Sequence, residues 1–349
     1  MKAKLILENG VVFEGSAFGH IHESVGEVVF NTGMTGYEEV LTDPSYYGQI
    51  VTMTYPLVGN YGINLEDMES SSAKVKAFIV REKCDNPNNF RYEMKLDGYL
   101  RQNGIMGLEG IDTRALTKIL RNHGTMKGII TLKDLTQTEV KERLDAFCNR
   151  DAVRTVSVKE PYVIEGGNKH IAVLDCGIKA NILRSFKKRG CKMTVFPAFA
   201  TAEEILSVNP DALFLSNGPG DPADLPEIVD MIKTVAESKP VIGICLGHQL
   251  LAWAFGGSTA KLKFGHRGCN HPVKDLQTGR VYITSQNHGY YVDTLPQDME
   301  VTHISMNDGT VEGMKHKSLP VFSVQYHPEA CPGPRDMQDV IFDRFVEMI

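Results

Sequence analysis

The sequence lacks the segments that mark exported and membrane-spanning proteins. Its most apolar stretch, 241–257, is interrupted by His248 and Gln249 and is shorter than the roughly 20 residues that a helix needs to cross a bilayer. The N-terminus has too few consecutive apolar residues for the apolar region of a signal peptide. The seven cysteines, an odd number, include no C-x-x-C pair, which argues against a disulfide framework and a zinc knot. We therefore expect a cytoplasmic protein.

Charge and motif content exclude further classes of protein. The net charge is -6 at pH 7 without a long run of one sign, so neither nucleic acid nor a membrane surface is an expected partner. The chain contains no G-x-x-x-x-G-K-S/T, no G-x-G-x-x-G after a strand and no H-E-x-x-H. We therefore expect no cofactor and no metal in this chain, and we expect small molecules or proteins as its partners.

Length and composition predict two domains. A chain of 349 residues, 42% hydrophobic and 23% charged, exceeds the usual span of one hydrophobic core. We predict an N-terminal domain at 1–150 and a C-terminal domain at 169–349. The intervening segment, 151–168, has no clear periodicity and contains Pro161, so we interpret it as a linker.

The N-terminal domain is predicted to mix strands and helices. Two alternating apolar runs flank Asn9-Gly10, a pair that favours tight hairpin turns. Helical patterns follow at 92–102 and 113–122, and Thr136 begins a third helix with a capping box.

The C-terminal domain shows apolar strands in alternation with helices. The strands are IAVLD, MTVFP, DALFLS and PVIGIC, and helical patterns cover 178–189, a segment capped by Thr201 and Glu204, and 226–238. This order predicts an α/β fold with a mainly parallel sheet flanked by helices.

Cys245 stands at a predicted corner between a buried strand and a helix. In VIGICLGHQLL, Gly243 and Gly247 flank the cysteine two positions away, which is the G-x-C-x-G pattern of a nucleophile elbow. Small residues avoid clashes at such a strained turn, and a helix N-terminus with a nearby imidazole stabilises a thiolate. Alone, the motif also fits a buried structural cysteine, so the hypothesis of a nucleophile requires a base elsewhere.

His327 and Glu329 supply a candidate base and its orienting carboxylate. Both follow the apolar strand VFSVQ, at the point where a parallel strand would end. His327 could accept the thiol proton and later protonate a leaving amine, while Glu329 holds the imidazole in one tautomer. Alone, H-x-E is more typical of a surface histidine beside a solvated glutamate.

The loop SNGPGDP, at 216–222, follows another apolar strand and is too rich in glycine and proline to continue it. Such a loop can direct a backbone N–H at a developing oxyanion, with the N–H of Leu246 as a second donor. In isolation it could equally be an ordinary turn.

Four motifs in order, SNGPGDP, GICLGHQ, SQNHGYY and YHPEA, resemble the class I glutamine amidotransferase domain. Residues 30–62 and 110–124 are similar to the small subunits of carbamoyl-phosphate synthases, and with 175–191 the resemblance spans nearly the whole chain. It implies that Cys245 attacks the side-chain amide of L-glutamine, releases ammonia and forms a glutamyl thioester that water hydrolyses, with His327 and Glu329 completing the triad.

The resemblance also implies a substrate site and a partner. The implied glutamine-binding residues are Ser45 from the N-terminal domain, then Gly218, Gly220, Leu246, Gln249, Asn287, Gly289 and Tyr290. The partner is a large synthetase subunit that docks with the N-terminal domain, receives the ammonia, and uses ATP and Mg to make carbamoyl phosphate for pyrimidines and arginine.

Three residues depart from the family pattern, namely Tyr290, where phenylalanine is common, Cys331, where serine is usual, and Cys176, where an aromatic residue is frequent. None belongs to the triad.

Two alternative functions remain open. One is a glutaminase subunit of another synthase, which the N-terminal motifs make less favoured. The other is a non-catalytic scaffold, which the intact triad makes less favoured.

Overall fold

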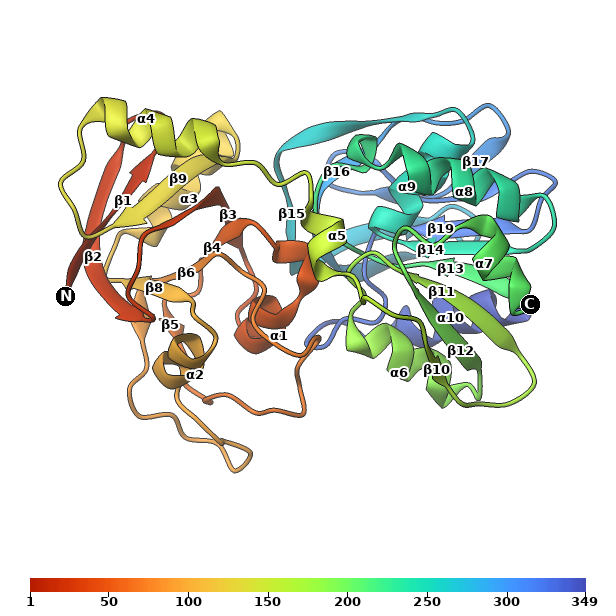
Figure 1. Ribbon diagram of the computed structural model, residues 1–349, viewed down its shortest axis with the longest axis horizontal. Helices are drawn as coiled ribbons and strands as arrows, with labels where there is room; N and C mark the ends of the chain where they lie inside the picture. Colours follow the sequence, from red (N-terminus) through yellow and green to blue (C-terminus); the bar gives the residue numbers. More distant parts are fainter. The chain divides into compact units, whose positions relative to one another are not determined.

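The computed structural model describes residues 1–349 and divides into two compact units, Met1–Asn149 and Arg150–Ile349 (Figure 1). The segment 151–168, interpreted from the sequence as a linker, contains helix α5 (Ala152–Val156) and strand β10 (Tyr162–Ile164). Strand β10 pairs with β12 (Lys192–Pro197), so this segment belongs to the second unit. None of the helices combines the length and the apolar character that crossing a bilayer requires.

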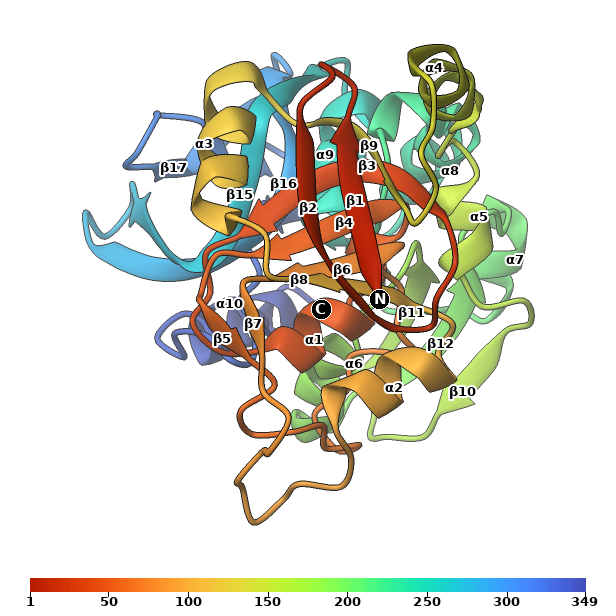
Figure 2. The same ribbon diagram turned by 90° about the vertical axis from the view of Figure 1, so that its left-hand side faces the viewer.

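The first unit is built on a closed β-barrel (Figure 2). Around the barrel the strands are β1 (Lys2–Leu7), β2 (Val12–Gly19), β8 (Met106–Glu109), β6 (Ala77–Val80), β4 (Gln49–Met53), β3 (Ser24–Asn31) and β9 (Met126–Thr131). The predicted hairpin is confirmed, because β1 and β2 pair antiparallel and Gly10 adopts a φ of 85° in the turn. Strand β9 pairs with β1 and closes the barrel, which removes the unpaired strand edges.

Helices surround this barrel. They are α1 (Tyr37–Thr42), α2 (Leu96–Gln102), α3 (Thr113–His123) and α4 (Gln137–Ala146), with a 3-10 turn at Pro44–Tyr46 and short paired strands β5 (Leu57–Val58) and β7 (Glu82–Lys83). The capping box predicted at Thr136 is present, since its side chain accepts from the Glu139 backbone and Glu139 bonds back. The pattern at 92–102 forms a helix only from Leu96 onward.

The second unit has the predicted α/β fold, built on one ten-stranded sheet. Its order is β10, β12, β11 (His170–Asp175), β13 (Ala212–Leu215), β14 (Val241–Ile244), β19 (Val321–Val324), β18 (Val311–His316), β17 (Met299–Ser305), β15 (Ser258–Asp275) and β16 (Val281–Thr294). Neighbours from β12 to β19 are parallel, whereas β18 to β16 continue the sheet with antiparallel pairs. The sequence pattern predicted the parallel part and did not separate the antiparallel part from it.

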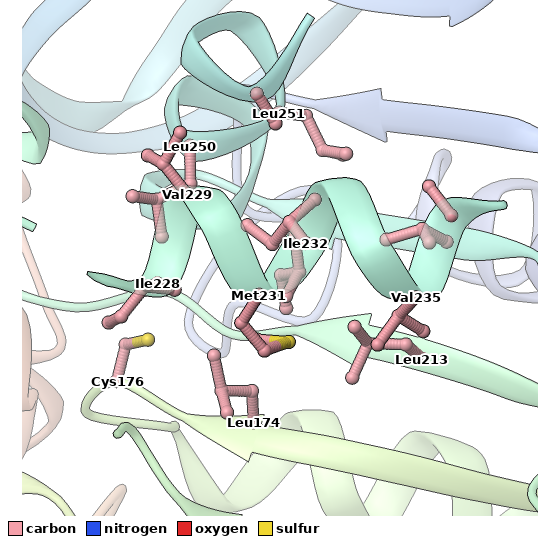
Figure 3. Packing of buried hydrophobic residues seen from close by; sticks show 14 of the residues in the cluster. Leu174, Cys176, Leu213, Ile228, Val229, Met231, Ile232, Val235, Leu250 and Leu251 are labelled. Atoms are coloured by element: carbon pink, nitrogen blue, oxygen red, sulfur yellow. The ribbon is translucent and has the colours of Figure 1, made fainter. Parts of the chain in front are cut away.

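Helices cover both faces of the parallel strands and form two hydrophobic cores. On one face lie α6 (Ala180–Lys188) and α10 (Gln338–Glu347), and on the other lie α7 (Ala202–Ser207), α8 (Pro226–Ala236) and α9 (Leu246–Ala254), with a 3-10 turn at Pro222–Asp224 before α8. Helix α8 begins with proline at its first position and buries Ile228, Ile232 and Val235, the helical spacing of one face. In Figure 3, Ile228 lies beside Cys176 and Val235 lies beside Leu213 of the sheet.

The neighbouring strands β14 and β19 determine where the functional residues meet. They run parallel, with Ile244 opposite Val324, so their carboxyl ends reach the same edge of the sheet. Such an edge is where open α/β sheets place their sites. Cys245 follows the first strand directly, and His327 follows the second after two residues.

Candidate active site

Cys245 occupies the sharp turn that the sequence predicted. It links β14 to α9 with φ 55° and ψ -104°, a conformation that a residue with a side chain rarely adopts. Its backbone N–H donates to the Val324 carbonyl, which keeps the turn attached to β19. The residue is 2% exposed, and its sulfur lies 3.7 Å from the carbonyl oxygen of Asn287. Backbone strain of this kind costs about 1–3 kcal/mol and persists where function requires it.

The two glycines beside Cys245 are required by close backbone packing. A Cβ atom at Gly243 would lie 2.9 Å from the carbonyl carbon of Gly247. A Cβ atom at Gly247 would overlap the backbone oxygen of Leu215 on the neighbouring strand β13. Because a backbone cannot move aside cheaply, the mechanical role predicted for these glycines is confirmed.

His327 and Glu329 form a buried pair at the end of β19. The His327 backbone donates to the Ser285 carbonyl, and its Nδ1 lies 2.8 Å from Oε1 of Glu329. The second ring nitrogen, Nε2, has no hydrogen-bond partner in the protein. Since Nδ1 contacts a carboxylate, Nε2 is the nitrogen that remains to exchange a proton with a nucleophile.

Lys179 is a third charged residue in this buried cluster, beside His327 and Glu329. Its Nζ lies 2.7 Å from the same oxygen of Glu329 that contacts His327, and both side chains are buried. Lysine is almost never fully buried unless it is paired. Lys179 lies in the segment 175–191 that carries the family resemblance, but the sequence assigned it no role. It is the second residue of the helix predicted at 178–189, where a lysine gives no signal of function, and the observed helix begins one residue after it.

These contacts set the charge states of the pair. Burial and Lys179 lower the pKa of His327, but Glu329 and the Cys245 side chain outweigh them and raise it to about 10. Burial raises the pKa of Glu329, whereas Lys179 and His327 lower it to about 2. At neutral pH an imidazolium therefore lies beside Cys245 and stabilises negative charge on its sulfur.

Two of the predicted glutamine-binding residues, Asn287 and Gln249, contact Cys245, and Gln249 in turn contacts a third, Tyr290. Asn287 directs its carbonyl at the sulfur. Gln249, one turn into α9, donates from Nε2 to the Tyr290 carbonyl at 2.9 Å and to Oε1 of Gln325 at 3.0 Å. Asn287 and Tyr290 both come from β16, so the antiparallel part of the sheet forms one side of the site.

The predicted oxyanion loop packs against the start of α9. A Cβ atom at Gly218 would lie 2.8 Å from Cδ2 of Leu246 and would overlap the Cys176 carbonyl, so only glycine fits there. Leu246 is the first residue of α9, and its N–H therefore has no acceptor within the helix. The loop therefore packs against the residue that follows Cys245, and the donor roles of the loop and of the Leu246 N–H stay predictions.

The remaining predicted residues differ in what the structure says of them. Gly289 lies on β16 between two of the residues above, close to Nη2 of Arg267. Gly220 adopts a φ of 95°, which favours glycine, but no contact links it to Cys245. Ser45 belongs to the first unit, where its N–H donates to the Asp43 side chain. Roles in binding glutamine stay predictions for all the residues that the sequence assigned to the substrate site.

Sequence comparisons give the chain two family matches. Residues 172–348 match "Glutamine amidotransferase class-I", and residues 5–130 match "Carbamoyl-phosphate synthase small chain, CPSase domain". The chain is 70% identical to the carbamoyl phosphate synthase small chain of Clostridium perfringens, over 99% of both chains. It is 55% identical to the carbamoyl phosphate synthase pyrimidine-specific small chain of Bacillus subtilis, over 100% of this chain and 96% of that relative.

Proposed function

Because the chain belongs to the carbamoyl-phosphate synthase small-chain family and carries a class I glutamine amidotransferase domain, we propose that it hydrolyses L-glutamine at Cys245. The ammonia passes to a large synthetase subunit, which uses ATP and Mg to make carbamoyl phosphate for pyrimidine and arginine synthesis. The observation that carries the proposal is the strained Cys245 turn beside a buried imidazolium and carboxylate.

The reaction starts with the Cys245 thiolate, whose sulfur bonds to the carboxamide carbon of glutamine. The carbonyl oxygen becomes an oxyanion, which backbone N–H groups at Gly218 and Leu246 stabilise, each such donor being worth about 10² to 10³ in rate. The tetrahedral intermediate collapses as the C–N bond breaks. The His327 imidazolium gives its Nε2 proton to the nitrogen, and ammonia leaves a glutamyl thioester.

Water completes the cycle. His327, now neutral, takes a proton from water as its oxygen bonds to the thioester carbon, and the C–S bond then breaks to release glutamate and the Cys245 thiolate. Glu329 accepts from Nδ1 throughout, and therefore keeps Nε2 as the nitrogen that exchanges the proton. Lys179 holds the Glu329 carboxylate in its ionised form.

The large subunit is the partner that the N-terminal unit and its family match support. The alternative of a glutaminase subunit for another synthase has no support in residues 5–130, which match the carbamoyl-phosphate synthase family. Ser45 and Gly220 would complete the glutamine site.

Replacing Cys245 by serine tests the function in the complex with the large subunit. Glutamine-dependent carbamoyl phosphate synthesis should fall at least about a thousandfold, since the nucleophile is lost, while ammonia-dependent synthesis persists. Cys148→Ser, at an exposed cysteine of the first unit, is the matched control and should leave both activities intact. Retained glutamine turnover in Cys245→Ser would refute the proposal.

A further inference from the structure

Glu312 is a wholly buried carboxyl group that the proposed reaction does not use. It lies on β18 with no exposed surface. Its Oε2 accepts from Nε2 of Gln286 at 2.9 Å, whereas Oε1 has no hydrogen-bond partner and lies 3.7 Å from Nδ1 of His266. Burying an ionisable group is unfavourable unless its contacts compensate, so what Glu312 contacts is informative.

Side-chain contacts lead from Glu312 to the strand that borders Cys245. Oε1 of Gln286 lies 3.0 Å from Nε2 of His288, and Nδ1 of His288 lies 2.7 Å from the carbonyl oxygen of Tyr290. This carbonyl is the one that Gln249 also contacts. The three residues Gln286, His288 and Tyr290 lie on β16, which contacts β18 although the two strands are not neighbours in the sheet.

Each hydrogen bond along this path has one donor and one acceptor only if either His288 or Glu312 carries an additional proton. The Tyr290 carbonyl only accepts, so Nδ1 of His288 carries a hydrogen. If Oε1 of Gln286 faces Nε2, His288 is an imidazolium balanced by the Glu312 carboxylate. If the amide is reversed, Gln286 donates to a neutral His288 and accepts from a protonated Glu312. Burial raises the pKa of Glu312 and lowers that of His288, which favours the second arrangement.

A metal ion is a weaker explanation of the same cluster. His266, His288 and Glu312 have potential ligand atoms within 4.8 Å of one another. Both ring nitrogens of His288 already have protein partners, and Nε2 of His266 contacts Asp308 at 2.8 Å. Only Nδ1 of His266 and Oε1 of Glu312 remain, fewer than the three or four protein ligands of zinc sites.

We propose that Glu312 is a positioning residue for glutamine binding, acting through Gln286 and His288 on the Tyr290 carbonyl and so on the substrate-binding part of β16. The inference rests on the proposed glutaminase function. A carboxyl group at this position holds the amide in one orientation, and the amide in turn holds the imidazole. Without it, the Tyr290 carbonyl on β16 loses the support of a fixed His288, although Gln249 still donates to it.

The test measures KM and kcat for glutamine in the complex with the large subunit. Glu312→Leu should raise KM about tenfold or more, the range expected for losing buried hydrogen bonds, and should change kcat less. Glu312→Gln should restore KM to within about threefold, because a glutamine amide can donate to Gln286 as a protonated Glu312 does, or accept from it as a carboxylate does. Glu300→Leu, the same change at an exposed glutamate on β17, is the control and should match the wild type.

A double-mutant cycle separates positioning from general destabilisation. Gln286→Met should raise KM as Glu312→Leu does, and the double variant should show no further rise, because both changes break one path. Gln286→Met also keeps the test decisive if Glu312→Leu fails to fold. An unchanged KM in folded Glu312→Leu or Gln286→Met, or KM effects that add in the double variant, would overturn the proposal. It would also be overturned if the wild-type protein bound one equivalent of zinc and Glu312→Gln bound none. Absence of wild-type glutamine turnover would instead count against the proposed function.

Discussion

Replacing Lys179 by methionine should destabilise the second unit by removing one partner of a buried ion pair. The lysine Nζ lies 2.7 Å from Oε1 of Glu329, and neither side chain is more than 6% exposed. In the variant, Glu329 would remain buried with His327 as its charged partner. Loss of one partner is severe for such pairs because the other charge stays desolvated.

The size of the effect follows from the cost of breaking a buried ion pair, and its pH range follows from the pKa of Glu329. Removing one partner of such a pair costs about 3–5 kcal/mol, so we expect Lys179→Met to lower the free energy of unfolding by about 3 kcal/mol at pH 7. Burial raises the pKa of Glu329, but Lys179 and His327 together lower it from 4.5 to about 2. Because the pKa of Glu329 is lower in the folded than in the unfolded protein, this stabilisation is complete above pH 4.5 and is lost as the pH falls toward 2. The difference in unfolding free energy between the wild type and Lys179→Met should therefore shrink over that pH range.

Urea unfolding followed by the fluorescence of Trp253 measures this change in the second unit. Trp253, the only tryptophan of the chain, lies on α9. Lys315→Met is the matched control, since Lys315 pairs with Glu300 at the surface, and it should cost less than about 1 kcal/mol. The double variant Lys179→Met/Glu329→Gln should recover part of the loss, because no carboxylate is left buried without the lysine. Equal stability of Lys179→Met and Lys315→Met would refute the reasoning.

Two further predictions concern Cys245 and His327. Cys245→Gly should be more stable than Cys245→Ala by about 1 kcal/mol, because glycine adopts the φ of 55° without strain; equal urea midpoints would contradict this. His327→Gln should cost more stability at pH 7 than above pH 10, because the His327 pKa is raised from 6.5 to about 10 and its stabilisation is lost as the pH rises through that value. Unfolding curves at both pH values measure the difference, and a cost that is independent of pH would argue against a charged His327.

Local sequence signals were sufficient for elements whose ends are determined by a few neighbouring residues. The capping boxes at Thr136 and Thr201 begin α4 and α7 as predicted, because both partners lie three residues apart. The corner at Cys245 was predictable for the same reason. Placing His327 beside it required more, since β14 and β19 are neighbours in the sheet but are separated in the chain by four strands.

Contacts across long sequence distances were not predictable from one sequence. Closure of the barrel depends on Leu5 pairing with Ile130, and nothing local to either strand indicates the other. Lys179 and Glu329 meet only because α6 and the end of β19 reach the same edge. No sequence motif indicated Glu312. Its proposed role depends on burial on β18 against β16, which is not a neighbour of β18 in the sheet.

The two parts of the sheet contribute different kinds of groups to the site. Parallel strands deliver the side chains of Cys245 and His327 at their ends, whereas β16 delivers main-chain carbonyls of Asn287 and Tyr290 from its middle. Strand β16 is the last strand of the sheet, and its register against β15 shifts near Asn287 and Tyr290. Some of its backbone groups are therefore not paired with a neighbouring strand. Open strand edges favour aggregation unless they are covered, and here α9 contacts β16. A main-chain carbonyl remains when its own side chain is replaced. Substitutions of Asn287 or Tyr290 would therefore underestimate the contribution of the β16 backbone to the site. Changes at the residues that support this backbone are the more direct probe.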